Sequence, residues 1–391
     1  MPNKSIVIVG TGFTGAYLAR NLAEQGWKVK MLERREHIAG QMYDKVDEET
    51  GCLVHEYGPH IFHTDDEDIW QWLNRFSDFI PYKLKTQVFF ETQQDWFTCS
   101  FGFHTIEKLY EEEKAEEIKN RLLKAYPGRE KVTIPELLSS DDELIKEFVN
   151  VLWEEDYKPY TAKQWGIDPK DVDPDILKRV PVYLSHFDKI HNKKYEALPN
   201  QGYTKLFENI LNHKNICIEL GIDAMDVLEI KRNKVYYRGR ESTVVFTGAI
   251  DELLKYEYGE LSYRSLKFKK EITKNDKTTV SGDPAVDIYP DSKYEYTRIT
   301  NYGKLPIQNH LDYQISSKEY SYQFEVGTDL ERYYPLNTQA DKVKYQKYLT
   351  KAKKIKGLYL SGRLADYKYY DMDKALIAAR ETLNLILKEN E

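Results

Sequence analysis

Along the first forty residues, the spacing of hydrophobic and polar positions changes from a strand pattern to a helix pattern and back. Residues 5–9 form a mainly apolar run rich in β-branched side chains, which is typical of a buried parallel strand. Apolar positions then recur at helical spacing from residue 16 to 25, and Gly26 ends that helix. Residues 27–32 return to a strand pattern. The order strand, helix, strand predicts a Rossmann-like βαβ unit in an α/β fold.

A glycine-rich turn joins the first strand to the helix and carries the pattern G-x-G-x-x-G. The first glycine allows a tight turn, the second lets the backbone approach a pyrophosphate, and the third lets the helix pack against the strand. Glu33, at the end of the second strand, can accept hydrogen bonds from ribose hydroxyls. The alternative is an ordinary glycine turn in any α/β domain. The predicted dinucleotide-binding residues here are Gly10, Gly12, Phe13, Thr14, Gly15 and Glu33.

Two further segments favour FAD over NAD. Residues 33–40 resemble the E-x-R-x-x-x-G-G extension of FAD-dependent oxidoreductases, although an ordinary charged turn is the alternative. Residues 357–363 predict a late strand that ends in glycine, and a helix starts near Asp371. In such folds the N-terminus of the last helix lies at the flavin, where its dipole stabilises an anionic reduced ring.

The middle of the chain carries other patterns. Helical spacing predicts one short amphipathic helix at 68–76, a solvated helix at about 105–127 and at least one more in 133–153. Strands are expected in 82–101 and 216–247, and an antiparallel sheet at about 262–330. The expected units are an FAD-binding domain (1–80, 203–250 and 352–391), a helical domain with the substrate loop (103–182) and an antiparallel sheet domain (81–102, 183–202 and 251–351).

Composition excludes several classes of function. The net charge of −7 argues against non-specific binding to nucleic acid. No apolar run approaches the roughly 18 residues of a membrane span, and a strand starts too early for a signal peptide. Three widely spaced cysteines suit a reduced, cytoplasmic protein. His60 and His63 have no third ligand at a suitable spacing, so no metal site is expected.

Several motifs together resemble the UDP-galactopyranose mutase family over nearly the whole chain. They are the glycine turn, YGPHIFHT at 57–64, YTAKQWG at 160–166, KRVPV at 178–182, YRS at 263–265, YTRIT at 296–300, and the segments 362–364 and 369–373. The resemblance implies an isomerase that interconverts the pyranose and furanose forms of a nucleotide sugar for cell-surface polysaccharide synthesis. It implies that the N5 atom of reduced FAD bonds covalently to the sugar C1, with NAD(P)H or another reductant for activation. It also implies a homodimer.

The resemblance assigns roles to individual residues. Arg179 and Arg264 would flank the diphosphate and act with His63 in catalysis, the alternative for each arginine being a surface ion pair. The loop 166–199 would close over the substrate. Further expected FAD-binding residues are Arg34, Gln41, His60, His63, Arg363, Tyr369, Asp371 and Met372. Expected substrate-binding residues are Tyr160, Thr161, Gln164, Trp165, Arg179, Arg264, Tyr334, Tyr369 and Asp371, with Leu84 and Ile288. For Tyr160 and Trp165 the alternative is a place in the helical core.

The chain departs from the family pattern near the expected sugar site. Leu84 and Ile288 stand where the family has asparagines, Ile190 where it has a tyrosine, and Tyr183 where it has an arginine. A familiar Leu-Pro has become Cys-Ser at 99–100. An aliphatic wall suits a methyl group, so a 6-deoxy sugar such as that of dTDP-fucopyranose is one hypothesis. The other is sequence drift, with galactose still accepted.

Two alternative functions are compatible with parts of the sequence. An oxidoreductase of the amine-oxidase type shares the N-terminal flavin motifs but has no use for a diphosphate clamp. A non-catalytic flavin- or sugar-nucleotide-binding protein would not need the two arginines with Asp371.

Overall fold

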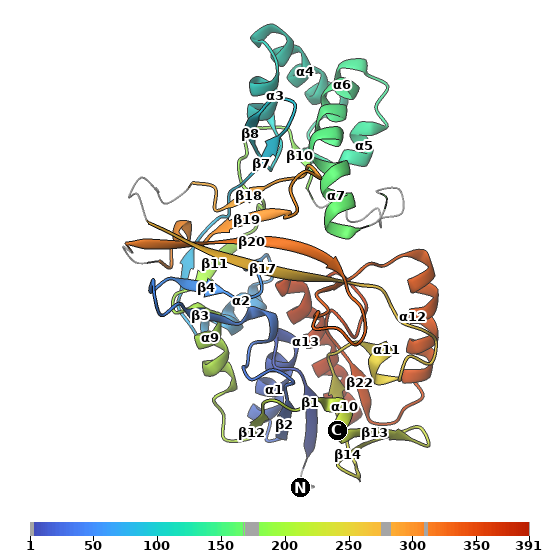
Figure 1. Cartoon of the computed structure of the whole chain (residues 1–391). Coiled ribbons are helices and arrows are strands. Elements are labelled where there is room, and N and C mark those ends of the chain that lie inside the picture. The colour runs from blue at the N-terminus through green and yellow to red at the C-terminus, as the bar shows by residue number, and fades with distance from the viewer. Residues whose placement is uncertain (1–3, 167, 169–179, 275–282, 309–311, 391) are drawn as a thin grey trace.

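The computed structural model describes residues 4–166, 168, 180–274, 283–308 and 312–390. The molecule is built in three parts along one direction (Figure 1). A parallel sheet with its helices lies at the bottom of that view, a long antiparallel sheet crosses the middle, and a group of helices lies at the top. Both termini are at the bottom end.

The five-stranded parallel sheet has the order β12-β2-β1-β16-β22. Its strands are β1 (Ser5–Val9), β2 (Lys28–Leu32), β12 (Ile216–Glu219), β16 (Val244–Phe246) and β22 (Leu358–Leu360). One face is covered by α1 (Phe13–Glu24), which packs against α9 (Gly202–Leu211) and α13 (Met372–Glu389). The other face meets α11 (Ile250–Leu253) and α12 (Gln339–Ala352). Burial on both faces explains why the first strand is a nearly continuous apolar run.

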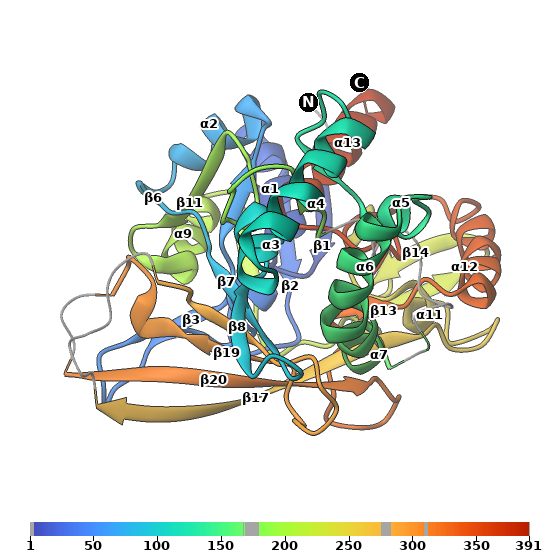
Figure 2. The ribbon, with the colours of Figure 1, turned by 90° about the horizontal axis from the view of Figure 1, so that it is seen from above.

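The second sheet has seven strands in the order β21-β17-β20-β19-β18-β7-β8. All neighbours are antiparallel except the parallel pair β18–β7. Its strands are β7 (Thr86–Phe90), β8 (Asp95–Thr98), β17 (Tyr263–Lys274), β18 (Val286–Ile288), β19 (Arg298–Asn301), β20 (Tyr313–Gln323) and β21 (Tyr334–Pro335). Figure 2 shows the long β17–β20 pair running along one side of the molecule, where α7 (Lys158–Trp165) packs against β20.

The helical part differs from the sequence prediction in two respects. The single helix expected at 105–127 is wrong, because the structure has α3 (Phe103–Leu109) and then α4 (Glu112–Ala125). Tyr110 between them is extended, and the acidic residues that follow it favour a new helix N-terminus. Three more helical elements precede α7: α5 (Ile134–Leu138), α6 (Glu143–Leu152) and the π-turn η2 (Trp153–Tyr157). The π-turn was not expected from the sequence.

Short elements connect these parts. They are η1 (Gly40–Met42), β3 (Asp44–Val46), β4 (Leu53–His55), β5 (Phe62–Thr64), α2 (Glu67–Asn74), β6 (Phe79–Pro81), β9 (Lys131–Val132), β10 (Val182–Tyr183), β11 (Tyr195–Pro199), α10 (Ala224–Val227), β13 (Leu228–Lys231), β14 (Lys234–Tyr237), β15 (Arg240–Glu241) and η4 (Tyr302–Lys304). The Rossmann-like fold class is confirmed, and so is the expected strand–helix–strand order near the N-terminus. The division of the chain into three domains stays a prediction.

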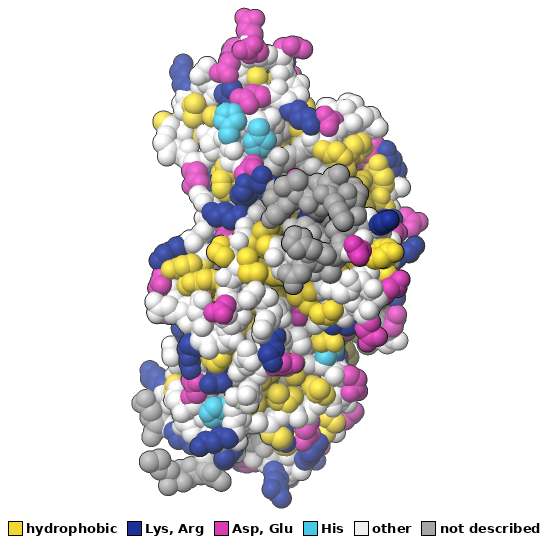
Figure 3. Space-filling view, turned by 90° about the vertical axis from the view of Figure 1, so that its left-hand side faces the viewer, with side chains coloured by type: hydrophobic (Ala, Val, Ile, Leu, Met, Phe, Trp, Pro, Cys, Tyr) yellow, Lys and Arg dark blue, Asp and Glu magenta, His cyan; other side chains and the backbone are white. Residues whose placement is uncertain are grey.

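The surface carries both signs of charge. On the face drawn in Figure 3, Lys and Arg side chains are interspersed with Asp and Glu, and acidic side chains gather at the outer tip of the helical part. Of the helices in the described ranges, none is long and apolar enough to cross a membrane. The exposed charges thus offer no single large field of one sign on this face.

Candidate functional site

One cavity of about 760 Å³ reaches from the glycine turn to the helical part. Most of the residues singled out from the sequence line it: Gly10, Gly12, Phe13, Thr14, Gly15, Glu33, Arg34, Gln41, His60, His63, Leu84, Tyr160, Thr161, Gln164, Trp165, Ile288, Tyr334, Arg363, Tyr369, Asp371 and Met372. Arg264 is not among the described lining residues, and Arg179 lies outside the described part of the chain. The cavity therefore brings together segments that are distant in sequence.

The three glycines of the turn differ in what requires them. Gly10 has a φ of +93°, and a Cβ at Gly15 would lie 2.0 Å from the Gly10 carbonyl oxygen, so the fold itself needs both. Gly12 has an ordinary φ of −69°, and a Cβ there would meet only the Gly40 Cα at 4.0 Å. No contact among the described residues requires a glycine at position 12. A Cβ at this position would instead fill the space in which a dinucleotide pyrophosphate approaches the start of α1.

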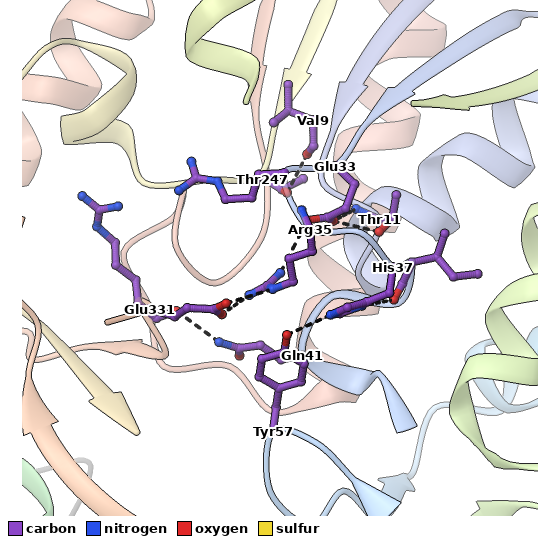
Figure 4. A network of polar contacts seen from close by, with 12 residues as sticks. Val9, Thr11, Glu33, Arg35, His37, Gln41, Tyr57, Thr247 and Glu331 are labelled. Atoms are coloured by element: carbon purple, nitrogen blue, oxygen red, sulfur yellow. Dashed lines mark hydrogen bonds and ion pairs between the residues drawn. The ribbon is translucent and has the colours of Figure 1, made fainter. Parts of the chain in front are cut away.

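Glu33 is buried at the end of β2 and held in a fixed orientation (Figure 4). One carboxylate oxygen accepts from the Thr11 N–H at 3.0 Å and from the Thr11 hydroxyl at 2.8 Å, and the other accepts from the Arg35 N–H at 3.1 Å. Arg35 pairs with Glu331 at the end of the antiparallel sheet. The network therefore ties the dinucleotide end of the cavity to the segment that follows β20.

Two other predicted cofactor residues are bonded to each other across the cavity wall. The Arg363 guanidinium donates to the Gln41 Oε1, and the Gln41 amide donates to the Arg332 carbonyl oxygen at 3.1 Å. The sequence predicted a helix that starts near Asp371, and this is confirmed: Asp371 is the N-cap position of α13 and Met372 begins the helix. The positive end of the α13 dipole is thereby directed at the cavity.

The two histidines singled out from the sequence lie on the cavity wall but not as a metal pair. Within the described residues, no cluster of three His, Cys, Asp or Glu could hold a metal ion. Burial holds the pKa of His60 well below its usual value, so its imidazole is neutral. His63 stacks on His191 with ring centroids 3.9 Å apart.

Aromatic and polar side chains meet at the end of α7. Trp165 contacts Tyr334 and Tyr369, with ring centroids 4.9 and 5.5 Å apart. The Gln164 amide donates to the Tyr334 hydroxyl at 2.6 Å. Burial raises the pKa of Tyr334 well above its usual value, so its hydroxyl remains neutral. Three of these groups also face the cavity from α7 and β21, where they can bind a polar ligand together.

Arg264 is held at the end of α7, and its expected contact with the diphosphate stays a prediction. Its guanidinium donates to the Gln164 carbonyl oxygen at 2.9 Å and to the Ser321 hydroxyl at 2.8 Å. A weaker bond reaches the Lys163 carbonyl oxygen at 3.4 Å. A cation at the last carbonyls of a helix interacts favourably with the helix dipole. In this structure Arg264 therefore supports the C-terminus of α7.

A buried ion pair near α7 was missed by sequence reasoning. Arg298 on β19 lines the cavity and pairs with Glu319 on β20, and the Glu319 side chain is almost fully buried. Burial alone would lower the pKa of Arg298, but the adjacent carboxylate outweighs it and raises that pKa. The signal was present, since Arg298 lies within the motif at 296–300, but its partner is 21 residues further along.

Several positions that depart from the family pattern line the cavity. Leu84, Ile190 and Ile288 all line the cavity, whereas Tyr183 is not among the described lining residues. Leu84 precedes β7, and Ile288 ends the neighbouring strand β18. Aliphatic side chains thus stand at three cavity positions where the family pattern has hydrogen-bonding groups. Cys99 and Asp156 also line the cavity, and no sequence pattern singles out Asp156.

Comparisons with known proteins agree with this geometry. A family model described as UDP-galactopyranose mutase matches residues 156–369, and one described as an NAD(P)-binding Rossmann-like domain matches residues 8–76. The dTDP-fucopyranose mutase of Escherichia coli is 35% identical over 99% of both chains. A probable UDP-galactopyranose mutase of Klebsiella pneumoniae is also 35% identical, over 100% of this chain and 98% of its own.

Solved structures show a similar fold at low sequence identity. A reduced UDP-galactopyranose mutase has a TM-score of 0.70 and 14% identity, covering 99% of this chain and 94% of that one. Putrescine oxidase has a TM-score of 0.60 and 11% identity, with 99% of each chain covered. The structural likeness alone therefore does not separate a mutase from an amine oxidase.

Proposed function

The chain belongs to the UDP-galactopyranose mutase family, and from that premise we propose that it is a reduced-FAD-dependent mutase of a nucleotide sugar. It interconverts the pyranose and furanose forms of the sugar. The observation that carries the proposal is the single cavity in which the glycine turn and the aromatic end of α7 face a common space. A dinucleotide and a nucleotide sugar can then meet inside it.

The donor groups at the glycine end suit FAD. The open space beside Gly12 accommodates a pyrophosphate, and the fixed Glu33 carboxylate can accept from ribose hydroxyls. The N-terminus of α13 and the Arg363–Gln41 pair would lie at the flavin ring. Reduced flavin supplies a nucleophilic nitrogen for the anomeric carbon of the sugar.

The protein's own contribution is to bind and orient the nucleotide sugar. The neutral Tyr334 hydroxyl and the Tyr369 hydroxyl beside it can donate hydrogen bonds to the diphosphate. Trp165 and Gln164 fix the position of these groups, and Arg264 holds the end of α7 that carries them. Arg179 remains a predicted partner of the diphosphate. His60, as a neutral imidazole, can donate or accept a hydrogen bond without adding charge beside the sugar.

The aliphatic wall supports a preference for a 6-deoxy sugar. Leu84, Ile190 and Ile288 offer no hydrogen bond to a sugar hydroxyl, and they suit a methyl group. The proposed substrate is therefore of the dTDP-fucopyranose type, with UDP-galactopyranose as the poorer substrate.

An anaerobic assay tests both parts of the proposal. FAD-loaded protein is reduced with dithionite and given dTDP-fucopyranose and UDP-galactopyranose in parallel, and furanose products are separated by chromatography. We expect turnover of the fucose nucleotide with the larger kcat/KM. A larger value for the galactose nucleotide would remove the sugar preference only. Absence of furanose from both, with peroxide release from an amine, would favour the amine-oxidase alternative.

A further inference from the structure

Asp156 is a buried carboxyl group that the proposed reaction does not yet use. It lies in the π-turn η2 between α6 and α7, is 5% exposed and lines the cavity. Among the residues that the structure describes, none donates a hydrogen bond to its carboxyl group or forms an ion pair with it. Burying a carboxyl group without a partner is costly, and π-turns inside helices are frequent at functional sites. The arrangement therefore indicates a ligand that supplies the missing partner.

The surroundings of Asp156 limit what that ligand can be. Cys99, Tyr157 and Tyr160 lie around it and line the same part of the cavity. Tyr157 is fixed by a hydrogen bond from its hydroxyl to the Val180 carbonyl oxygen at 2.5 Å and by a ring contact with Phe101. Aromatic rings and one acid suit a flat, uncharged heterocycle. They do not suit a diphosphate, which a carboxylate would repel.

The position of Asp156 also separates it from the reacting sugar. The sugar must contact the cofactor, whose glycine turn lies at the parallel sheet in the lower part of Figure 1. Asp156 belongs to the π-turn η2, which connects α6 to α7, and both of these helices lie in the upper part of that view. The nucleoside end of a nucleotide sugar is the part of the substrate that extends in this direction.

On this basis, which rests on the proposed function, we propose that the Asp156 carboxyl group reads the nucleobase of the substrate. It pairs with the N3–H and an adjacent carbonyl group of uracil or thymine. Both relatives with 35% identity are named for substrates that carry one of these two bases. A protonated carboxyl group offers an acceptor next to a donor, which matches the acceptor and donor of this base edge.

The protonation state of Asp156 follows from its surroundings. Burial raises the pKa of Asp156 to about 7. The titratable groups described around it are Cys99, Tyr157 and Tyr160, and burial raises the pKa of each above its usual value, so none is charged near neutral pH. Below pH 7 the neutral carboxyl group can make both hydrogen bonds. Above pH 7 the carboxylate still accepts from N3–H but opposes the base carbonyl.

Binding of UDP and dTDP to the FAD-loaded, oxidised full-length protein tests this assignment. Dissociation constants are measured by calorimetry between pH 6.5 and 8.5 for the wild type, Asp156→Asn and Asp156→Leu. An asparagine amide also offers a donor beside an acceptor but does not titrate. We expect the wild-type Kd to rise relative to that of Asp156→Asn, approaching tenfold per pH unit above 7. We expect Asp156→Leu to bind about 10- to 100-fold more weakly at pH 6.5.

Two controls identify the cause of any change. Glu154→Gln alters an exposed acid on the same π-turn and should bind both nucleotides like the wild type. N3-methyl-UDP lacks the N3–H and should bind the wild type as weakly as UDP binds Asp156→Leu. Equal pH dependence in the wild type and Asp156→Asn, or normal UDP binding by Asp156→Leu, would overturn the role of Asp156 alone. Failure of the FAD-loaded wild type to bind either nucleotide would contradict the proposed function itself.

Discussion

The two ends of the cavity are built in different ways. At the glycine end, the residues from Gly10 to Gln41 belong to one continuous βαβ segment and its extension. At the helical end, neighbouring side chains come from positions as distant as Leu84, Asp156, Ile288 and Tyr334. A site within one segment leaves a motif with fixed spacing, whereas a site assembled by tertiary packing leaves none. The first end can be recognised from local spacing alone, whereas the second is recognised only through the resemblance to a family, which gave no role to Asp156.

The largest expected effect is on FAD affinity, and it distinguishes Gly12 from Gly15 in the glycine turn. In Gly12→Ala the new methyl group meets no protein atom closer than 4.0 Å, so we expect a folded protein that has lost at least tenfold in FAD affinity. In Gly15→Ala the methyl group would lie 2.0 Å from the Gly10 carbonyl oxygen, so the fold itself should be destabilised. The ratio of flavin to protein absorbance and a thermal melt of the apoprotein measure the two effects. Equal FAD content in Gly12→Ala and wild type would contradict the role given to Gly12.

The second-largest expected effect concerns Arg264, which supports the C-terminus of α7 at the helical end of the cavity. Arg264→Ala removes the cation from the last carbonyls of α7, which positions Trp165 and Gln164. We expect kcat/KM to fall by about 100-fold, because small displacements of positioning groups are costly for a reaction. Steady-state kinetics of the reduced enzyme measure the loss. Arg238→Ala, which breaks an exposed ion pair with Glu219, is the matched control and should behave like the wild type. Unchanged kcat/KM in Arg264→Ala would show that α7 needs no such support.

A smaller effect is expected on the aliphatic wall. The double variant Leu84→Asn with Ile288→Asn restores hydrogen-bonding groups to one cavity position just before β7 and to another at the end of β18. The ratio of kcat/KM for dTDP-fucopyranose to that for UDP-galactopyranose should then fall by about tenfold, since one methyl contact is worth about that much in discrimination. Competition between the two substrates in one reaction gives the ratio directly. An unchanged ratio would mean that the sugar does not contact this wall.

The smallest expected effect is on the pH dependence of stability, and it concerns Asp366, which follows strand β22. The Asp366 carboxyl group accepts from the Gly362 N–H at 3.1 Å, and burial raises the pKa of Asp366 to about 6. The folded state thus holds this proton more tightly than the unfolded state does, so stability is lost as pH rises from about 4 to about 6. Asp366→Asn should remove this loss, which is on the order of 1 kcal/mol or roughly 2 °C in Tm. Thermal melts of both proteins at pH 4.5 and pH 8 test it, and an identical pH dependence would refute it.

The fold was predictable where periodicity and capping agree. The strand at 5–9, the helix after the glycine turn and the helix that starts at Asp371 all follow from local patterns. The break at Tyr110 was not foreseen, because no glycine or proline marks it. Helix α9 was also missed, since its first residue is a glycine with a φ of +82° and no side chain caps it.

The candidate site was predictable to the extent that it follows motifs. Most of the residues expected to bind FAD or substrate line the cavity, although their roles remain predictions. Arg264 could not be oriented from sequence, because its partner is the end of a helix about 100 residues earlier. Asp156 gave no signal either, since a carboxyl group without a partner is recognised only when its three-dimensional surroundings are known.

The order of strands in the parallel sheet has a consequence for biogenesis. Strand β22 pairs with β16 at one edge, and it is contributed by residues 358–360 near the end of the chain. At typical synthesis rates, roughly 20–70 s separate the appearance of β1 from that of β22. The sheet that carries the glycine turn therefore cannot be completed while most of the chain is being made, whereas the helical part has largely local contacts and can fold earlier. Stable loading of the cofactor is expected only after residues 358–360 have been made and paired with β16.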